Sequence, residues 1–204
     1  MRVRADANFF LSLILIFLIN PADYTFVFLC ACAVHEMGHV VFLKIFNIKK
    51  AEISLGLAGA NISADTSRIS YAKELVIYMG GAFFNLAFAV VLLCFLHCRF
   101  EMLTMFFFLS NVFLALINLI PSKSLDGGRA LECVLCMFFD PFVSEKITLW
   151  VSFFSSLLIA VTGAFAVFSG ELNLTFLLFA STLVFESVYR TYPFLFRKNY
   201  CISG

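Results

Sequence analysis

Long apolar runs separated by short polar breaks make up most of the chain. A helix needs about 20 apolar residues to cross a bilayer core, within a range of about 17–25. Six runs approach that length, at about residues 7–20, 24–46, 74–97, 102–120, 147–169 and 172–190. The pattern predicts an all-α, polytopic membrane protein with about six transmembrane helices, in a single domain over residues 1–204.

The first run begins like a secretory signal peptide, because Arg2 and Arg4 precede an apolar stretch at residues 9–19. A signal peptide ends in small residues at its cleavage site, whereas this run ends in Ile19-Asn20-Pro21. We therefore expect a retained first span. Its short length is accommodated by tilt, by local thinning of the bilayer or by packing against neighbouring helices.

Two longer polar stretches interrupt the pattern, at about residues 47–73 and 121–146. Within the first, residues 51–57 alternate apolar and polar positions, and residues 58–61 supply turn-forming types. Ile62 and Ala64 then resume the alternation, which is typical of strands. We expect a small β-hairpin over about residues 52–64, after the second span.

The composition supports a membrane location. Hydrophobic residues make up 62% of the 204 residues and charged residues 13%, whereas a soluble domain averages about 45–50% apolar and about 25% charged residues. This excludes a disordered chain, a nucleic-acid-binding surface and an ordinary cytosolic enzyme. The formal net charge of +1 indicates no strongly acidic or basic partner, so we expect a lipid bilayer and no nucleic acid around the protein.

The seven cysteines do not describe a disulfide framework, because their number is odd and most lie inside apolar runs. Cys133 and Cys136 form a CxxC pair, and the sequence has no second pair to accompany it. At helical spacing, packing of two small side chains is favoured over a redox or metal site.

The positively charged residues give the spans a direction. With six spans and a cytoplasmic N-terminus, Arg99 alone of the 14 Lys and Arg residues falls outside. The other 13 fall on the cytoplasmic side: Arg2, Arg4, Lys44, Lys49, Lys50, Arg68, Lys73, Lys123, Arg129, Lys146, Arg190, Arg197 and Lys198. The positive-inside rule therefore predicts a multi-pass protein with both termini and both long polar stretches in the cytoplasm.

The candidate chemistry lies inside the second run, in His35-Glu36-Met37-Gly38-His39. Two histidines four positions apart share one helix face, so both imidazoles reach one metal ion. The spacing suits Zn²⁺, which in catalytic sites takes three protein ligands and keeps one position open. The metal lowers the pKa of a bound water, and Glu36 accepts its proton and later passes it to a leaving amine. A structural, hydrogen-bonded His/Glu cluster is the alternative, but ionisable groups are costly inside an apolar span.

A third ligand has to come from elsewhere, and Asp126 is the best candidate. Pro121 ends or bends the fourth span before it, and Gly127 and Gly128 after it permit a tight backbone path. Asp-Gly-Gly alone is an ordinary turn, but beside an intramembrane HExxH a ligand role is favoured. Both halves of this site are predicted on the cytoplasmic side, with His39 about 10 Å from the end of its helix.

A third motif, Gly80-Gly81-Ala82-Phe83-Phe84-Asn85, lies early in the third span. Its small residues let helices approach closely within a membrane. The amide of Asn85 stabilises an oxyanion or holds a substrate backbone, or else it forms an interhelical hydrogen bond. The sequence leaves these alternatives open.

In order and spacing, these motifs resemble those of the site-2 protease family of intramembrane zinc metalloproteases (peptidase family M50). The matching segments are His35–His39, Gly80–Asn85, Asn118–Pro121 and Leu125–Arg129. The resemblance implies one Zn²⁺ per chain, held by His35, His39 and Asp126. It also implies Glu36 as the catalytic base, Asn85 near the scissile peptide, and a short β-sheet along which an extended substrate adds as a strand.

The resemblance covers about residues 24–130, and the small size and six-span plan look closest to the stage IV sporulation protein FB subgroup. Members of that subgroup process a membrane-associated precursor of a sporulation sigma factor in bacteria. They often carry a C-terminal nucleotide-sensing CBS domain, whereas here 14 residues follow the last predicted span and no PDZ-type insertion is visible. The resemblance implies a membrane-associated protein substrate and an inhibitory membrane-protein partner.

We therefore expect a zinc endopeptidase that cleaves peptide bonds in or near a membrane segment, with a polar cleft open to the cytoplasm. A metal transporter that uses the same ligands is one alternative, although the outer halves of the spans are almost wholly apolar. A non-catalytic membrane scaffold is another, and the intact Glu36 counts against it.

Overall fold

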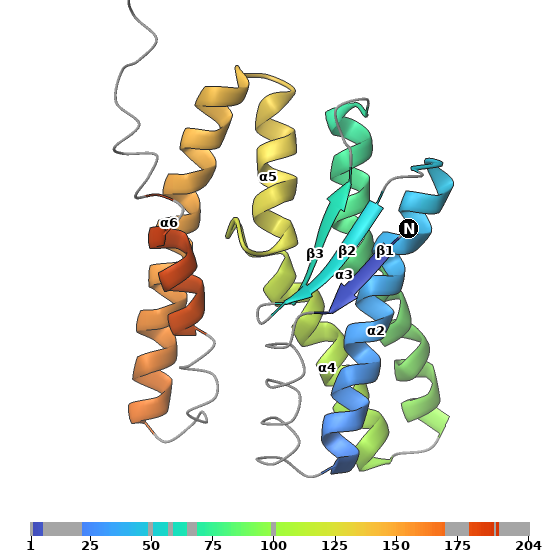
Figure 1. Cartoon of the computed structure of the whole chain (residues 1–204). Coiled ribbons are helices and arrows are strands. Elements are labelled where there is room, and N and C mark those ends of the chain that lie inside the picture. Colours follow the sequence, from blue (N-terminus) through green and yellow to red (C-terminus); the bar gives the residue numbers. More distant parts are fainter. Residues whose placement is uncertain are drawn as a thin grey trace, which may run out of the picture. The chain divides into compact units, whose positions relative to one another are not determined.

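The computed structural model describes residues 2–5, 22–48, 51–56, 59–64, 69–98, 101–169, 180–189 and 191. The chain divides into two units, Met1–Leu119 and Ile120–Gly204. The elements of the first unit are β1 (Arg2–Ala5), α2 (Ala22–Ile45), β2 (Ala51–Gly56), β3 (Gly59–Ala64), α3 (Tyr71–Cys98) and α4 (Met102–Asn118). Those of the second unit are α5 (Asp126–Cys136) and α6 (Pro141–Phe168), as labelled in Figure 1.

Three of the described helices, α2, α3 and α6, are long and apolar enough to cross a membrane. They correspond to the runs predicted at 24–46, 74–97 and 147–169. The fourth predicted run forms α4, which is apolar but has 17 residues. Its length of about 26 Å is slightly short of a bilayer core of about 30 Å.

Two predicted spans fall largely on residues that the structure does not describe. The run at 7–20 lies outside the described residues. The run at 172–190 is described from residue 180 to 189, and these residues are helical. The helices fit a multi-pass membrane protein, while the count of six spans and the single domain over 1–204 stay predictions.

The end of α2 is fixed by a local backbone motif. The N–H of Ile48 donates to the carbonyl of Leu43, and the N–H of Asn47 donates to that of Lys44, each at 3.0 Å. Asn47 has a φ of 56°, the left-handed conformation that closes such Schellman ends. Ile48 then packs against the buried Leu43, as is common in this motif.

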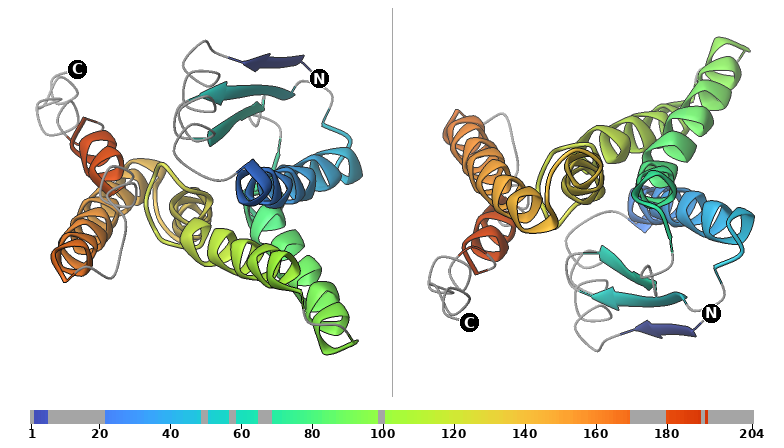
Figure 2. Two further views of the ribbon diagram at one scale, coloured as in Figure 1. Left: turned by 90° about the horizontal axis from the view of Figure 1, so that it is seen from below. Right: turned by 90° about the horizontal axis from the view of Figure 1, so that it is seen from above.

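The strands form a three-stranded sheet in the order β1-β2-β3, which Figure 2 shows. β2 and β3 pair antiparallel from Ala51↔Ala64 to Gly56↔Gly59, so the hairpin predicted over 52–64 is present. The predicted turn over 58–61 is wrong in extent, because residues 59–61 already belong to β3. β1 pairs parallel to β2, and the sequence pattern gave no sign of it.

The helices α2, α3 and α4 each pack against the other two. Glycines let α2 and α3 approach closely, since a Cβ on Gly38 would collide with the carbonyl of Gly80. Aromatic rings add edge-to-face contacts to α4, with Tyr24 on Phe106 at 4.9 Å and Phe88 on Phe107 at 5.3 Å between ring centroids. These three helices form the scaffold of the candidate site.

In the second unit α5 packs against α6. The helix α5 was not predicted, because the sequence pattern marked 121–146 as a polar stretch. α6 begins at Pro141, earlier than the predicted 147, since the carboxylate of Asp140 caps it by accepting a hydrogen bond of 2.9 Å from the N–H of Phe142. Cys133 is buried and Cys136 is half-buried on α5, which fits the packing role predicted for the pair.

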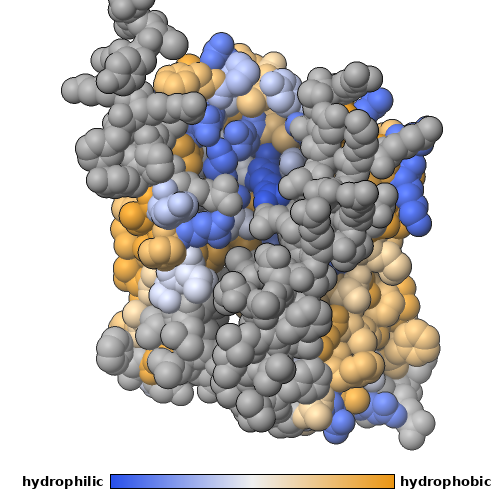
Figure 3. Space-filling view, in the orientation of Figure 1, coloured by the Kyte–Doolittle hydropathy of each residue, from blue (hydrophilic) through white to orange (hydrophobic). Residues whose placement is uncertain are grey.

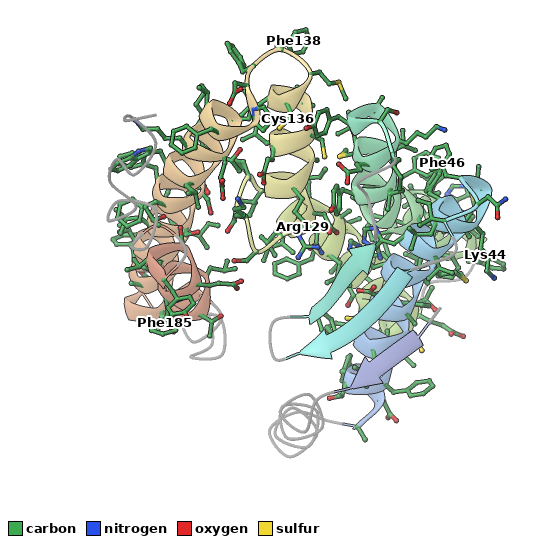
Figure 4. The ribbon with its side chains drawn as sticks, turned by 45° about the horizontal axis from the view of Figure 1, so that its top comes forward. Lys44, Phe46, Arg129, Cys136, Phe138 and Phe185 are labelled. Carbon is green, nitrogen blue, oxygen red and sulfur yellow. The ribbon has the colours of Figure 1, made fainter. Side chains whose placement is uncertain are left out.

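Apolar side chains dominate the outward faces of the helices. Figure 3 shows hydrophobic residues over the outer flank of α6 and over the lower part of α2. In Figure 4, Phe138 projects from the turn between α5 and α6, where it is 77% exposed. Large apolar side chains exposed in this number are typical of helices surrounded by lipid.

Candidate metal centre

The two predicted histidine ligands lie on one face of α2 and point at each other. The Nε2 atoms of His35 and His39 are 3.2 Å apart, and the side chains are 6% and 2% exposed. The ring centroids are 4.9 Å apart and the rings are nearly perpendicular, at 78°. The spacing of four residues therefore brings both imidazoles to one point, as predicted.

Each histidine uses its other ring nitrogen to reach α3. The Nδ1 of His35 lies 2.6 Å from the Oδ1 of Asn85, and the Nδ1 of His39 lies 2.8 Å from the backbone carbonyl of Ile77. Since a backbone carbonyl accepts and cannot donate, the Nδ1 of His39 carries the proton. In a neutral His39 the Nε2 atom then carries a lone pair that can bind a metal ion.

The distance between the two Nε2 atoms fits a shared metal ion. Nitrogen ligands about 2.0–2.1 Å from a tetrahedral Zn²⁺ lie about 3.3 Å from each other, close to the 3.2 Å found here. Histidines that bind zinc almost always donate their second N–H to a carbonyl or carboxylate, which fixes the ring. The contacts of both Nδ1 atoms match that arrangement, so these residues fit the predicted metal.

Glu36 follows His35 directly on α2. The residue is half-buried, and its Oε2 atom is shielded from solvent. Its carboxylate is the acid–base group that the sequence analysis assigned to this helix.

Asn85 connects all three helices of the scaffold. Its side chain is fully buried, and its Nδ2 donates to the carbonyl of Ala31 on α2 at 3.1 Å and to the Oδ1 of Asn111 on α4 at 2.8 Å. Its Oδ1 faces the Nδ1 of His35. Both N–H groups of the amide are thus used inside the protein, which favours the interhelical alternative over direct contact with an oxyanion.

Gly81 supplies the space beside the facing nitrogens. A Cβ at this position would lie 2.5 Å from the Nε2 of His39 and 2.6 Å from the Nε2 of His35. Any side chain here would occupy the place of the ligand atoms or displace the rings. The Gly-Gly sequence of this motif therefore serves the site as well as helix packing.

Asp126, the predicted third ligand, is the first residue of α5 in the second unit. The loop before it is tightly held: the N–H of Leu125 donates to the carbonyl of Ser122 at 2.8 Å, and the N–H of Lys123 donates to the Oγ of Ser152 on α6 at 2.8 Å. The Nζ of Lys123 forms ion pairs with Glu132 and Glu145, each at 3.3 Å. The carboxylate thus follows a loop anchored on both α5 and α6.

The two glycines after Asp126 lie within a helix, since Gly127 and Gly128 belong to the first turn of α5. A Cβ on Gly128 would collide with the backbone of Ser122. The glycine is needed because the loop crosses the helix at this point, not because of an unusual dihedral angle.

Two comparisons relate this arrangement to known proteins. The family model for peptidase family M50 matches residues 95–162, a segment that includes Asp126. Among solved structures, the chain is similar to the Site-2 Protease from Methanocaldococcus jannaschii, at 23% sequence identity and a TM-score of 0.69, covering 91% of this chain and 88% of that one. The first match relates part of the chain to peptidase family M50, and the second shows a similar fold.

The M50 match leaves out the HExxH segment, so His35, Glu36 and His39 stand on their own motif and geometry. The structural likeness to the site-2 protease is a likeness of fold. The search of curated proteins gave no match.

Asn111 is the residue that the sequence analysis missed. It is fully buried on α4, and its Oδ1 accepts the hydrogen bond from Asn85. An amide inside an apolar run is a signal in itself, because a polar group at membrane depth needs a partner. The sequence did not say which partner, since that depends on how α3 and α4 pack.

Proposed function

We propose that this chain is a zinc-dependent intramembrane protease, which hydrolyses peptide bonds in or near the membrane segment of a membrane-tethered protein. The observation that carries the proposal is the pair of facing imidazole nitrogens, 3.2 Å apart, on a helix long enough to cross a membrane. Two buried lone pairs that face each other repel unless a cation or a proton lies between them. The M50 match supports the same function.

The proposed ligands are His35, His39 and Asp126. Two imidazoles and one carboxylate form a donor set typical of catalytic zinc, with a fourth position left for the reactant. Zn²⁺ bound there supplies Lewis acidity and allows water to act as a nucleophile at neutral pH. The tight loop before Asp126 supports this assignment, because a ligand held by a rigid backbone loses less entropy on binding the metal.

Glu36 is proposed to move the proton. Its carboxylate accepts a proton from the attacking water and donates it to the leaving amine, which is general base and then general acid catalysis. Its place beside His35, with Oε2 shielded from solvent, supports this role. We assign Asn85 to holding His35, because its amide hydrogen bonds join the three helices.

The substrate has to be extended where it is cut, because a helix hides its carbonyls in its own hydrogen bonds. The three-stranded sheet has β1 and β3 at its edges, and an extended segment pairs readily with such an edge. We propose that the sheet receives the substrate in this way. The proposed partners are therefore a membrane-associated protein substrate and the bilayer. An inhibitory membrane protein is proposed on the family resemblance alone.

The finer assignments are also proposals. We place both termini in the cytoplasm and the centre nearer the cytoplasmic face of a bacterial cell membrane, on the distribution of Lys and Arg. On the resemblance of the motifs and the predicted six-span plan, we also propose the stage IV sporulation protein FB subgroup. A sporulation sigma-factor precursor is accordingly the first substrate to test.

The test is a Glu36→Gln substitution in the purified full chain, reconstituted in phosphatidylethanolamine/phosphatidylglycerol vesicles. The substrates are single-span reporter segments with a central Asn-Pro, and the matched control is Glu101→Gln at an exposed position before α4. We expect Glu36→Gln to keep its zinc and to lose cleavage by about 10²-fold or more. The control keeps both.

Each outcome bears on the proposal. Cleavage by Glu36→Gln at the wild-type rate would contradict the role of Glu36. Absence of zinc from the purified wild-type chain would contradict the proposed metal centre. Zinc passing across the vesicle membrane without cleavage of any reporter would favour the transporter alternative.

A further inference from the structure

A chain of buried hydrogen bonds connects α4 to His35 of the proposed metal centre. The Nδ2 of Asn111 donates to the carbonyl of Phe107 at 2.9 Å, and its Oδ1 accepts from the Nδ2 of Asn85 at 2.8 Å. The Oδ1 of Asn85 then lies 2.6 Å from the Nδ1 of His35. Both amides are 0% exposed, so these bonds form away from solvent.

The direction of this chain of hydrogen bonds is fixed at its far end. The carbonyl of Phe107 can only accept a hydrogen bond, so the side of Asn111 that faces it must be the NH₂ group. The oxygen of Asn111 therefore faces Asn85, which must present its own NH₂ group there. That leaves the oxygen of Asn85 for His35, whose Nδ1 must carry the proton.

The carbonyl of Ala31 requires the same orientation. It accepts from the Nδ2 of Asn85 at 3.1 Å, so the two N–H groups of this amide have separate acceptors on α2 and α4. If the amide of Asn85 were flipped, its oxygen would face both the carbonyl of Ala31 and the Oδ1 of Asn111, and both contacts would be repulsive. Asn111 therefore makes the orientation of Asn85 much harder to reverse than Ala31 alone would.

From this geometry we propose that Asn111 is a positioning residue of the centre. Acting through Asn85, it holds His35 in the tautomer that carries its proton on Nδ1 and presents the lone pair of Nε2 to the metal. The inference rests on the proposed function, since it assigns a task that only a metal-binding His35 requires. Partners that orient a ligating histidine typically change metal affinity by about 10–100-fold when they are removed.

The test is a double-mutant cycle on zinc affinity, measured in the detergent-purified full chain by competition with a chelator of known affinity. We expect Asn85→Leu to weaken zinc binding by about 10–100-fold and Asn111→Leu by about 3–10-fold. The double variant should match Asn85→Leu within about twofold, because Asn111 acts only through Asn85. Effects that multiply in the double variant would overturn the proposal.

Two further variants separate positioning from folding. Ser110→Ala removes a buried hydroxyl that donates to the carbonyl of Phe106 at 2.8 Å, next to Asn111 on the same helix, and should leave zinc affinity unchanged. Asn111→Asp with a protonated carboxyl keeps one donor and one acceptor, and should restore affinity to within about threefold of wild type. Loss of affinity in both, equal to that in Asn111→Leu, would indicate a merely structural role.

Failure of the proposed function can be distinguished from failure of the role proposed for Asn111. If the wild type binds zinc but cleaves no reporter, the protease proposal fails while the cycle still decides the role of Asn111. If the wild type binds no zinc, both proposals fail.

Discussion

Gly81 is the residue whose lack of a side chain matters most to the site. Hydrogen, rather than a methyl group, faces the Nε2 atoms of His35 and His39, and a Cβ would lie 2.5–2.6 Å from them. Neither ring can withdraw easily, because each Nδ1 is hydrogen-bonded to α3. The position therefore admits glycine alone if the two nitrogens are to share a metal.

A Gly81→Ala substitution should weaken zinc binding by about tenfold or more, because the added methyl group displaces the ligand nitrogens. Ala87→Val is the matched control, since it adds bulk at an exposed position of the same helix. Elemental analysis after equilibration with a zinc buffer measures both. Full zinc content in Gly81→Ala at limiting zinc would contradict the arrangement of the rings.

At the same scale, the sequence predicts some of the site residues but not how they are held. The HExxH spacing was enough to bring His35 and His39 together, because helix geometry alone decides it. The role of Asn85 stayed open and Asn111 was missed, since an amide in an apolar helix finds its partner through tertiary packing. The carbonyl of Ile77, which orients His39, has no sequence signal at all.

Among the elements, the end of α2 offers a test of local backbone geometry. Asn47 has a φ of 56°, so Asn47→Gly should keep or slightly raise the thermal unfolding midpoint. Asn47→Val should lower the free energy of unfolding by about 1–2 kcal/mol, because a β-branched residue is strained in the left-handed region. Thermal unfolding in detergent compares the two. Equal midpoints would mean that α2 ends in another way.

The loop that precedes α5 is held by α6 through Ser152. Its Oγ accepts the N–H of Lys123 and lies 3.4–3.5 Å from the hydroxyls of Ser187 and Ser122. Ser152→Ala should destabilise the protein by about 1–2 kcal/mol, because it removes the acceptor of a partly buried N–H.

Thr162→Val is the matched control for this change. Its hydroxyl lies exposed on α6 and bonds to a carbonyl of its own helix, so the expected effect is below about 0.5 kcal/mol. Thermal unfolding measures both variants. If Ser152→Ala unfolds at the same temperature as Thr162→Val, the loop is not anchored on α6.

Helices made of apolar residues were predicted well, and the amphipathic α5 was not. A search for long apolar runs finds α2, α3 and most of α6. It does not find α5, because this helix has only 11 residues and contains Glu132 and Arg129. Asp140 and Pro141 are residue types typical of a helix start, but the apolar run used to predict this span begins six residues later, at residue 147. Strand β1 depends on a parallel partner far along the chain, which no local pattern reveals.

For the whole molecule, the asymmetry of positive charge makes a prediction about direction in the membrane. A reporter that is active only outside the cell, such as alkaline phosphatase, should be active when fused after Arg99 and silent when fused after Lys123. A fluorescent protein that folds only in the cytoplasm should give the opposite result. Activity of the phosphatase at Lys123 would reverse the topology and place the centre nearer the outer face.

The central claim is that one zinc ion is held by two histidines and a carboxylate in this chain. Zinc K-edge absorption of the purified full chain tests it most directly. We predict one zinc per chain, with two imidazole nitrogens and oxygen ligands at about 2.0–2.2 Å. A chain without zinc, or a sulfur shell at about 2.3 Å that reveals cysteine ligands, would contradict the account.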